Sequence, residues 1–302
     1  MPLTVDSDPV SPPLRDTVQA VSTEGDEPPA IVSISDIHGY LQKAQQALLT
    51  LRDHPDFAPV VTADNDGRLH WANENYVLVF NGDLVDRGEE NEAVLAMVSR
   101  LIDEAPPGRV RVTLGNHEWM IMLPQRFKLS DWFSTKVSAE ERIQYVQRII
   151  DGYVIAAYEG HSVTYAHAGS PTAYDVTEVN ESLAEAAAEM KEAVGTMEDS
   201  TVQSKLRNNH QKVLGTGDTG IKGRGAGLVW LSFDHLDPDS PAQVVGHTRH
   251  AEPQTKGNVY CQDLILDNRG SPGGQGVFVE TKSSLTAVLR DSEQNVSTVE
   301  LE

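Results

Sequence analysis

The stretch from Val79 to Gly88, Val-Phe-Asn-Gly-Asp-Leu-Val-Asp-Arg-Gly, constrains the fold of this chain more than any other. The apolar run Tyr76–Phe80 predicts a short buried strand, and two aspartates and an arginine follow it closely. In α/β proteins, reactive side chains are delivered in this way at the carboxyl ends of sheet strands. Folding alone gives little reason to crowd these charges, so we expect a functional site here.

Two further predicted strands end in polar clusters. Residues 30–35 run into Asp36-Ile37-His38-Gly39, and residues 110–114 run into Gly115-Asn116-His117-Glu118. Helices are predicted over residues 40–52 and 89–104, between the three strands. This alternation predicts a parallel sheet with right-handed crossovers. The three polar clusters should therefore meet at one edge of the sheet.

Later segments add two histidines. A predicted hairpin, residues 153–158 and 162–165, ends at His167, and a predicted strand over 243–245 ends at His247. Carboxylate, imidazole and amide ligands suit manganese, iron or zinc. Two such ions about 3.5–4 Å apart clamp an in-line displacement at phosphorus. A pair of ions needs a bridging carboxylate, and Asp83 on the central strand is the candidate.

The order of these motifs resembles the calcineurin-like metallophosphoesterases. Gly-Asp-x-x-Asp-Arg-Gly resembles the phosphoprotein phosphatase branch, which includes bacterial and archaeal serine/threonine phosphatases and symmetrical diadenosine tetraphosphatases. The motifs cover residues 36–248. The resemblance implies an α/β fold, with two mixed sheets packed as a β-sandwich and flanked by helices in four layers.

The resemblance also implies a role for each motif residue. Asp36 and His38 would bind the first metal, Asp83 would bridge both, and the second metal would be completed by Asn116, His167 and His247. His117 would be the general acid, Asp86 would orient it, and Arg87 and Asn116 would hold the phosphate. Metal-bound hydroxide would attack phosphorus directly. These roles agree with the chemistry of histidine as a proton donor and of arginine as a planar phosphate ligand.

Other substrate-binding residues are less clearly marked. A second phosphate-binding arginine has no clear counterpart, and the candidates are Arg224 and Arg249, with His250 as a further contact. Residues 170–230, including the glycine-rich loop 215–227, are expected to form a cap. We expect Glu118 to be structural, hydrogen-bonding the active-site loop.

The expected activity is that of a serine/threonine-type phosphoprotein phosphatase acting on a phosphorylated protein or small phosphomonoester. The alternative is a hydrolase of diadenosine tetraphosphate or another nucleotide. The expected cap has few aromatic residues, mainly Tyr174 and Trp230, which favours the first. A non-catalytic metal-binding scaffold is a remote third interpretation, because a scaffold needs no general acid. The expected cofactor is a pair of Mn²⁺ ions, with iron, zinc, cobalt and nickel as alternatives.

The charge balance bears on partners and environment. Asp and Glu number 45 against 24 Lys and Arg, giving a net charge of -21, which disfavours nucleic acid and acidic membranes as partners. This composition resembles that of proteins from salt-loving organisms, where salt screens self-repulsion; an ordinary acidic protein is the alternative.

The absence of an apolar signal core and the single Cys261 indicate the cytoplasm. Residues 1–29 are predicted to be a disordered or loosely attached tail and 30–302 the phosphoesterase domain. The sequence carries no signal for the oligomeric state.

Overall fold

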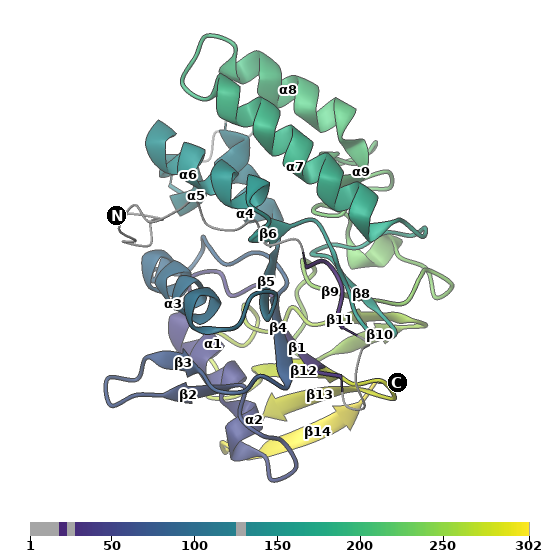
Figure 1. The fold of residues 1–302 in the computed structure, drawn as a ribbon. Helices are drawn as coiled ribbons and strands as arrows, with labels where there is room; N and C mark the ends of the chain where they lie inside the picture. Colours follow the sequence, from purple (N-terminus) through teal and green to yellow (C-terminus); the bar gives the residue numbers. More distant parts are fainter. Residues whose placement is uncertain (1–17, 23–27, 125–130, 302) are drawn as a thin grey trace.

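The computed structural model describes residues 18–22, 28–124 and 131–301. Two β-sheets stack against each other, and helices cover one outer face and one end of the stack (Figure 1). The helices are α1 (Leu41–Leu48), α2 (Thr50–Asp53), α3 (Asn91–Glu104), α4 (Asn116–Met122), α5 (Phe133–Lys136), α6 (Ala139–Ile150), α7 (Val176–Ala193), α8 (Asp199–Asn209), α9 (Gln211–Leu214) and the 3₁₀ helix η2 (Phe233–His235).

The larger sheet has the strand order β14-β13-β12-β1-β4-β5-β6. Its strands are β1 (Ala30–Ile34), β4 (Tyr76–Phe80), β5 (Val110–Thr113), β6 (Val154–Ile155), β12 (Gly276–Glu280), β13 (Leu285–Arg290) and β14 (Val296–Glu300). The strands β1, β4 and β5 are parallel, as predicted, and β6 adds a fourth parallel strand that was not predicted. Ile34 lies opposite Phe80, and Phe80 lies opposite Val112. The polar segments after β1, β4 and β5 therefore begin at the same edge.

The smaller sheet has the order β10-β11-β9-β8-β7. Its strands are β7 (Tyr158–Glu159), β8 (Thr164–Tyr165), β9 (Gln243–Val245), β10 (Gln254–Lys256) and β11 (Val259–Cys261). Strands β8 and β9 run parallel, with Tyr165 opposite Val244. The two segments that carry His167 and His247 therefore leave this sheet side by side. A separate hairpin joins β2 (Val61–Ala63) to β3 (Leu69–Trp71).

Alternating side chains along the strands build two cores. In β4, Val77 and Val79 pack with Tyr165 and other residues of the smaller sheet, whereas Leu78 belongs to the core beneath the helices. This alternation requires both faces of the larger sheet to be covered, and all five residues of β4 are buried. The fold is thus the predicted α/β sandwich. The outer face of the smaller sheet packs on the segment around η2, through Phe233 and Leu236.

The expected hairpin over residues 153–158 and 162–165 divides between the sheets. Strand β6 pairs with β5 in the larger sheet, and only β7 pairs with β8. The intervening Ala156 and Ala157 are buried, and the Asn180 side chain accepts hydrogen bonds from both backbone N–H groups. Helix α7, through Asn180, thereby satisfies the backbone where the chain crosses from one sheet to the other.

The ends of the expected domain show two features. Within the expected tail, residues 18–22 lie against β7, where Val21 is buried and donates to the Glu159 carbonyl; residues 1–17 and 23–27 lie outside the described part of the chain. Helices α7, α8 and α9 lie in the expected cap and pack with α6 at one end of the sandwich (Figure 1). Among the described residues, no helix combines the length and apolar composition needed to span a membrane.

Candidate metal centre

The site residues share an unusual backbone conformation. Seven non-glycine residues in the described part of the chain have a positive φ, and six of them carry the predicted site. These six are Asp36, His38, Asp83, Asp86, Arg87 and His247. A left-handed conformation costs a non-glycine residue about 1–3 kcal/mol and persists only where its surroundings enforce it. Here the sharp bends after β1, β4 and β9 turn the side chains into one pocket.

Three histidines are oriented by backbone carbonyls. The Nδ1 atoms of His38 and His167 lie 3.0 Å from the carbonyl oxygens of Val85 and Asn81. The Nε2 atom of His247 lies 3.1 Å from the Trp230 carbonyl. A carbonyl only accepts, so each of these nitrogens is the donor of its ring. When each ring is neutral, its other nitrogen is left as a lone-pair donor toward the pocket, as metal-ligating histidines require.

Two groups of buried side chains bring their potential ligand atoms within 4.8 Å of one another. One contains His38, Asp83 and His117, and the other contains Asp83, His167 and His247. The Asp83 Oδ2 atom lies 3.6 Å from His38 Nε2 and 3.4 Å from His167 Nε2. Asp83 is the only residue common to both groups, which is the geometry that a bridging carboxylate needs.

The remaining predicted ligands border these groups. The Asn116 Oδ1 atom lies 3.2 Å from His167 Nε2, and Asp36 Oδ1 lies 3.8 Å from His38 Nε2. Asp36 also accepts from the His247 backbone N–H at 3.0 Å. The structure therefore brings together all six residues predicted to bind metal. It also places the His117 ring close enough to Asp83 for His117 to be counted in the first group.

Electrostatics favour a cation in this pocket. Burial alone lowers the pKa of His167, but the carboxylates of Asp83 and Asp36 outweigh it and raise the pKa to about 10. Burial lowers the pKa of His38 to about 3 and that of His247 well below its usual range. His167 is therefore protonated near neutral pH in the protein alone, where its charge balances the buried acids. A bound divalent ion would neutralise the buried carboxylates in place of the proton on His167 and would displace that proton.

A third buried acid supports the fit of metal ions to this site. Asp263 is 1% exposed, and its carboxyl group lies beside that of Asp36, with no hydrogen bond from any other described group. Burial, with Asp36 and Asp83 nearby, raises its pKa well above the usual range. Buried carboxylates normally require a partner or a metal. The mixed oxygen and imidazole donor set, together with this uncompensated acid, fits hard or borderline divalent ions.

His117 is held on two sides. Its Nδ1 atom lies 2.5 Å from Asp86 Oδ2, and its ring stacks on Trp132 with 4.5 Å between centroids. Asp86 also accepts from the backbone N–H and the hydroxyl of Ser134. Asp86 is thus fully engaged in orienting His117. Asp86 does not cap helix α3, because the N-cap residue of α3 is Glu90 and no side chain forms a capping hydrogen bond there.

Glu118 fixes the loop that carries Asp83. Its carboxylate accepts from the backbone N–H groups of Asp83, Leu84 and Val85 at 2.8, 2.8 and 3.2 Å. The side chain is 1% exposed, and burial raises its pKa to about 7. The structural role expected for Glu118 is confirmed.

Cationic side chains surround the mouth of the pocket. Arg87 is exposed, lies 5.3 Å over the Trp132 ring and places Nη2 3.5 Å from His117 Nε2. Lys222 also lines the pocket and reaches the His247 carbonyl with Nζ at 3.4 Å. Arg249 lines the pocket as well, with Nη1 3.9 Å from Asp267. These three residues give an anionic substrate a positive entrance.

Two predicted substrate contacts are not in the lining of this pocket, whose volume is about 380 Å³. Arg224 is exposed and lies two residues beyond Lys222 on the same glycine-rich loop. His250 packs its ring against Phe233 and donates its backbone N–H to the Asp263 carbonyl. Of these two cations on the glycine-rich loop, Lys222 and not Arg224 lines the pocket.

Sequence reasoning also missed Trp132, Ser134 and Asp263. Trp132 and Ser134 lie outside every motif, so only the folded chain brings them to His117. Asp263 lies just after a short apolar run, Val259–Cys261, as Asp83 does after β4. Asp263 could therefore have been predicted as a site residue, because the other candidate residues were found in the same way, directly after a buried strand.

Comparison with known proteins agrees with this geometry. A model of the calcineurin-like phosphoesterase family matches residues 29–248. Shewanella-like protein phosphatase 2 from Arabidopsis thaliana is 30% identical over 104 residues, which are 34% of this chain and 24% of that protein. The match therefore spans about a quarter of that relative.

Solved structures share the fold. A cold-active protein-tyrosine phosphatase of a psychrophilic Shewanella species superposes with a TM-score of 0.60 and 19% identity, over 91% of this chain and 80% of its own. A protein serine/threonine phosphatase from Saccharomyces cerevisiae superposes with a TM-score of 0.50 and 16% sequence identity, over 94% of this chain and 83% of its own. The family match covers most of the chain and includes every predicted metal ligand. The chain therefore belongs to the calcineurin-like phosphoesterases, a family of metal-dependent phosphoric ester hydrolases.

Proposed function

We propose that this protein is a binuclear-metal phosphatase of the serine/threonine phosphoprotein type. The observation that carries the proposal is that Asp83 belongs to both groups of potential ligands. Asp36 and His38 would hold one ion with Asp83, and Asn116, His167 and His247 would hold the other. When bound, the ions would polarise the phosphoryl oxygens and lower the pKa of water to roughly 7.

His117 would supply the proton that the leaving oxygen needs. Its Nδ1 is engaged by Asp86, so only Nε2 is available to exchange a proton with a substrate. The stacked Trp132 ring and the Asp86 carboxylate fix the direction of that nitrogen. A carboxylate partner also stabilises the protonated imidazole, which is the form that acts as an acid. We therefore assign His117 as the general acid rather than as a metal ligand.

Arg87 and Lys222 would bind the phosphate from two sides. Arg87 extends from the loop after β4 and Lys222 from the glycine-rich loop, and both line the pocket. Arginine presents a planar fork to phosphate oxygens, whereas lysine acts as a point charge. Burial lowers the pKa of Lys222, while Asp83 and Asp36 oppose that shift. This lysine would therefore serve as the second phosphate-binding cation.

The aromatic residues of the pocket favour a phosphorylated protein over a nucleotide. A nucleotide base binds best on an aromatic face. The two indoles in the lining are Trp132 and Trp230. Trp132 stacks on His117, and the Trp230 ring meets Trp119 and His247 edge-on. Both indoles already contact rings of the protein, so the lining favours binding of a phosphate group over binding of a base.

A paired substrate assay tests this proposal. Manganese-loaded enzyme should release phosphate from a phosphoserine peptide with a higher kcat/KM than from diadenosine tetraphosphate. Lys222→Gln should lower kcat/KM for the peptide by about tenfold, because a hydrogen bond to a charged group is lost. Lys212→Gln is the matched control, since Lys212 is exposed on α9 and pairs only loosely with Glu178. Preferred turnover of the dinucleotide would instead support the nucleotide hydrolase.

A further inference from the structure

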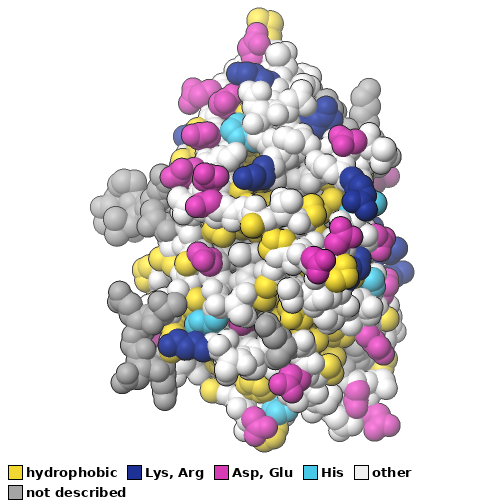
Figure 2. Space-filling model, turned by 90° about the vertical axis from the view of Figure 1, so that its right-hand side faces the viewer, with side chains coloured by type: hydrophobic (Ala, Val, Ile, Leu, Met, Phe, Trp, Pro, Cys, Tyr) yellow, Lys and Arg dark blue, Asp and Glu magenta, His cyan; other side chains and the backbone are white. Residues whose placement is uncertain are grey.

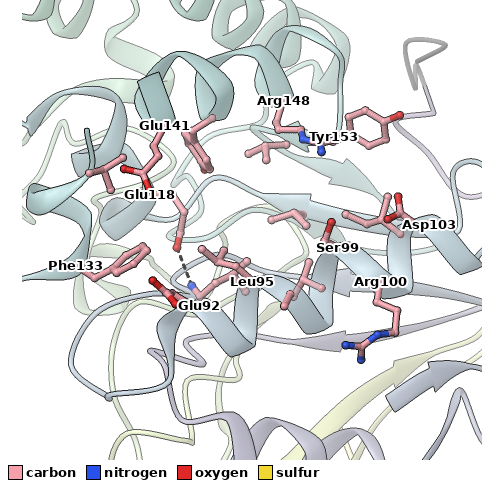
Figure 3. A pocket seen from close by; sticks show the side chains of 18 of the residues that line it. Glu92, Leu95, Ser99, Arg100, Asp103, Glu118, Phe133, Glu141, Arg148 and Tyr153 are labelled. Atoms are coloured by element: carbon pink, nitrogen blue, oxygen red, sulfur yellow. Dashed lines mark hydrogen bonds between the residues drawn. The ribbon is translucent and has the colours of Figure 1, made fainter. Parts of the chain in front are cut away.

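A second cavity lies on the helical side of the larger sheet. Its volume is about 500 Å³, and its walls come mainly from α3 and α6 (Figure 3). In Figure 3, Leu95 and Ser99 come from α3, and Arg148 from α6. Leu84 and Glu118 also line it, and both belong to the segments that build the metal centre. The cavity and the metal centre therefore share the Glu118 side chain as a common element.

The size and lining of the cavity suit a small organic molecule. Binding pockets of small ligands commonly have volumes of roughly 300–1,000 Å³ and mainly apolar walls. The apolar part of the lining includes Leu95, Val98, Val112, Phe133 and Val154. A flat ring system between the two helices would bury most of its surface against these side chains. The hydrophobic effect would then supply the main part of the binding energy.

Tyr145 indicates the polar group that such a molecule would carry. This residue lines the cavity and is 5% exposed, and its hydroxyl has no hydrogen-bond partner within the described ranges. Burial holds the pKa of Tyr145 well above its usual range, so the hydroxyl is a donor at neutral pH. A buried polar group without a partner is costly. An acceptor on the ligand, such as a carbonyl oxygen, would satisfy it.

Glu118 restricts the charge of the occupant. Its buried carboxylate already accepts three backbone N–H groups. An anion placed beside this carboxylate would meet only its acceptor oxygens and find no hydrogen-bond donor there. The other acidic residues of the lining, Glu92, Asp103, Glu104 and Glu141, are exposed or half-buried, so a cation seated on the buried apolar walls would lose its hydration without a buried acceptor to replace it. A neutral molecule avoids both costs.

We propose that this cavity binds a small neutral molecule that has an aromatic ring system and a carbonyl-type acceptor. Its occupancy is transmitted to the metal centre through Glu118, because the same carboxylate lines the cavity and holds the backbone of Asp83. The proposal concerns a second site, so it stands independently of the substrate assigned above.

Prodan, a neutral fluorescent naphthalene ketone, is a suitable probe. We expect saturable binding to the full-length protein, measured as a blue shift of its emission. Ala96→Phe should weaken binding at least tenfold, because Ala96 lines the cavity and the ring would fill it. Ala93→Phe is the matched control, one turn earlier on α3, exposed and outside the lining. It should bind as the wild type does. Absence of saturable binding, or equal binding by Ala96→Phe and the wild type, would overturn the proposal.

Two further measurements keep the proposal testable if Ala96→Phe does not fold. Tyr145→Phe removes only the hydroxyl and should weaken prodan binding about threefold to tenfold; unchanged affinity would refute the hydrogen bond. Calorimetric titration of Mn²⁺ with and without saturating prodan tests the coupling, with an expected change in affinity of about fivefold or more. Identical Mn²⁺ affinities would refute transmission through Glu118. Neither measurement depends on catalytic activity.

Discussion

At the scale of single residues, the site is organised by what holds each side chain. Backbone carbonyls orient the rings of His38, His167 and His247, and Asp86 orients His117. These contacts explain how the structure brings the predicted ligands together. Each ligand follows a buried strand, and the strand end determines its direction. Lys222 and Trp132 follow no strand, and only the tertiary structure brings them to the pocket.

The role of His117 can be tested by its removal. His117→Ala should lower kcat by about 10²–10⁴, because the leaving oxygen loses its proton donor. The metal content measured by elemental analysis should stay at the wild-type value, since we assign His117 as an acid and not a ligand. His54→Ala serves as the control on a partly exposed histidine outside the site.

Two outcomes would contradict this assignment. An unchanged kcat would exclude His117 as the general acid. A loss of bound metal would instead make His117 a ligand of the first ion, which is compatible with its distance of 3.8 Å from Asp83.

At the scale of elements, the parallel strands were predictable and the crossing between sheets was not. Strands β1, β4 and β5 and the helices between them follow from local hydrophobic patterns. The division of residues 153–158 between two sheets depends instead on Asn180 of α7, which satisfies the backbone at the crossing. A contact between residues so distant in sequence leaves no local pattern.

Helices α6 and α8 are joined by a buried ion pair. Arg142 Nη1 and Nη2 lie 2.6 and 2.8 Å from the two carboxylate oxygens of Asp199. Asp199→Asn should lower the free energy of unfolding by about 3–5 kcal/mol at neutral pH, because it leaves a buried guanidinium uncompensated. Urea unfolding measures this change.

The same pair predicts a pH dependence. Despite partial burial, hydrogen bonds from Arg142 and Gln203 hold the pKa of Asp199 below its usual value of 3.8. A carboxyl whose pKa is lower in the folded state than in the unfolded state stabilises the folded protein. This stabilisation is complete when the pH is above the pKa in the unfolded state, and it is lost as the pH falls through the pKa in the folded state. The stability difference between wild type and Asp199→Asn should therefore narrow below about pH 4. A difference that stays constant down to pH 2 would refute this account.

At the scale of the whole molecule, the charge is the dominant feature. Acidic side chains are scattered over the face in Figure 2 rather than gathered in one patch. With a net charge of -21, the folded state is destabilised by self-repulsion that salt would screen. We expect the melting temperature to rise by several degrees between roughly 0.1 and 1 M KCl, over which the Debye length falls from about 10 to 3 Å.

A charge variant separates screening from other effects of salt. Glu181, Glu185 and Glu192 are exposed on α7, and changing all three to Gln should reduce the salt-dependent rise. Differential scanning calorimetry compares the two proteins. An equal rise in both, or no rise in the wild type, would argue against an adaptation to high salt.

In the binuclear centre that we propose, Asp83 bridges two metal ions. The most direct test of this role is the metal content of purified, manganese-loaded wild type and Asp83→Asn, measured by elemental analysis. The exposed Asp64→Asn serves as a carboxylate control. We expect two ions per chain in the wild type and in the control, and at most one in Asp83→Asn. Retention of two ions per chain by Asp83→Asn would contradict the bridging role.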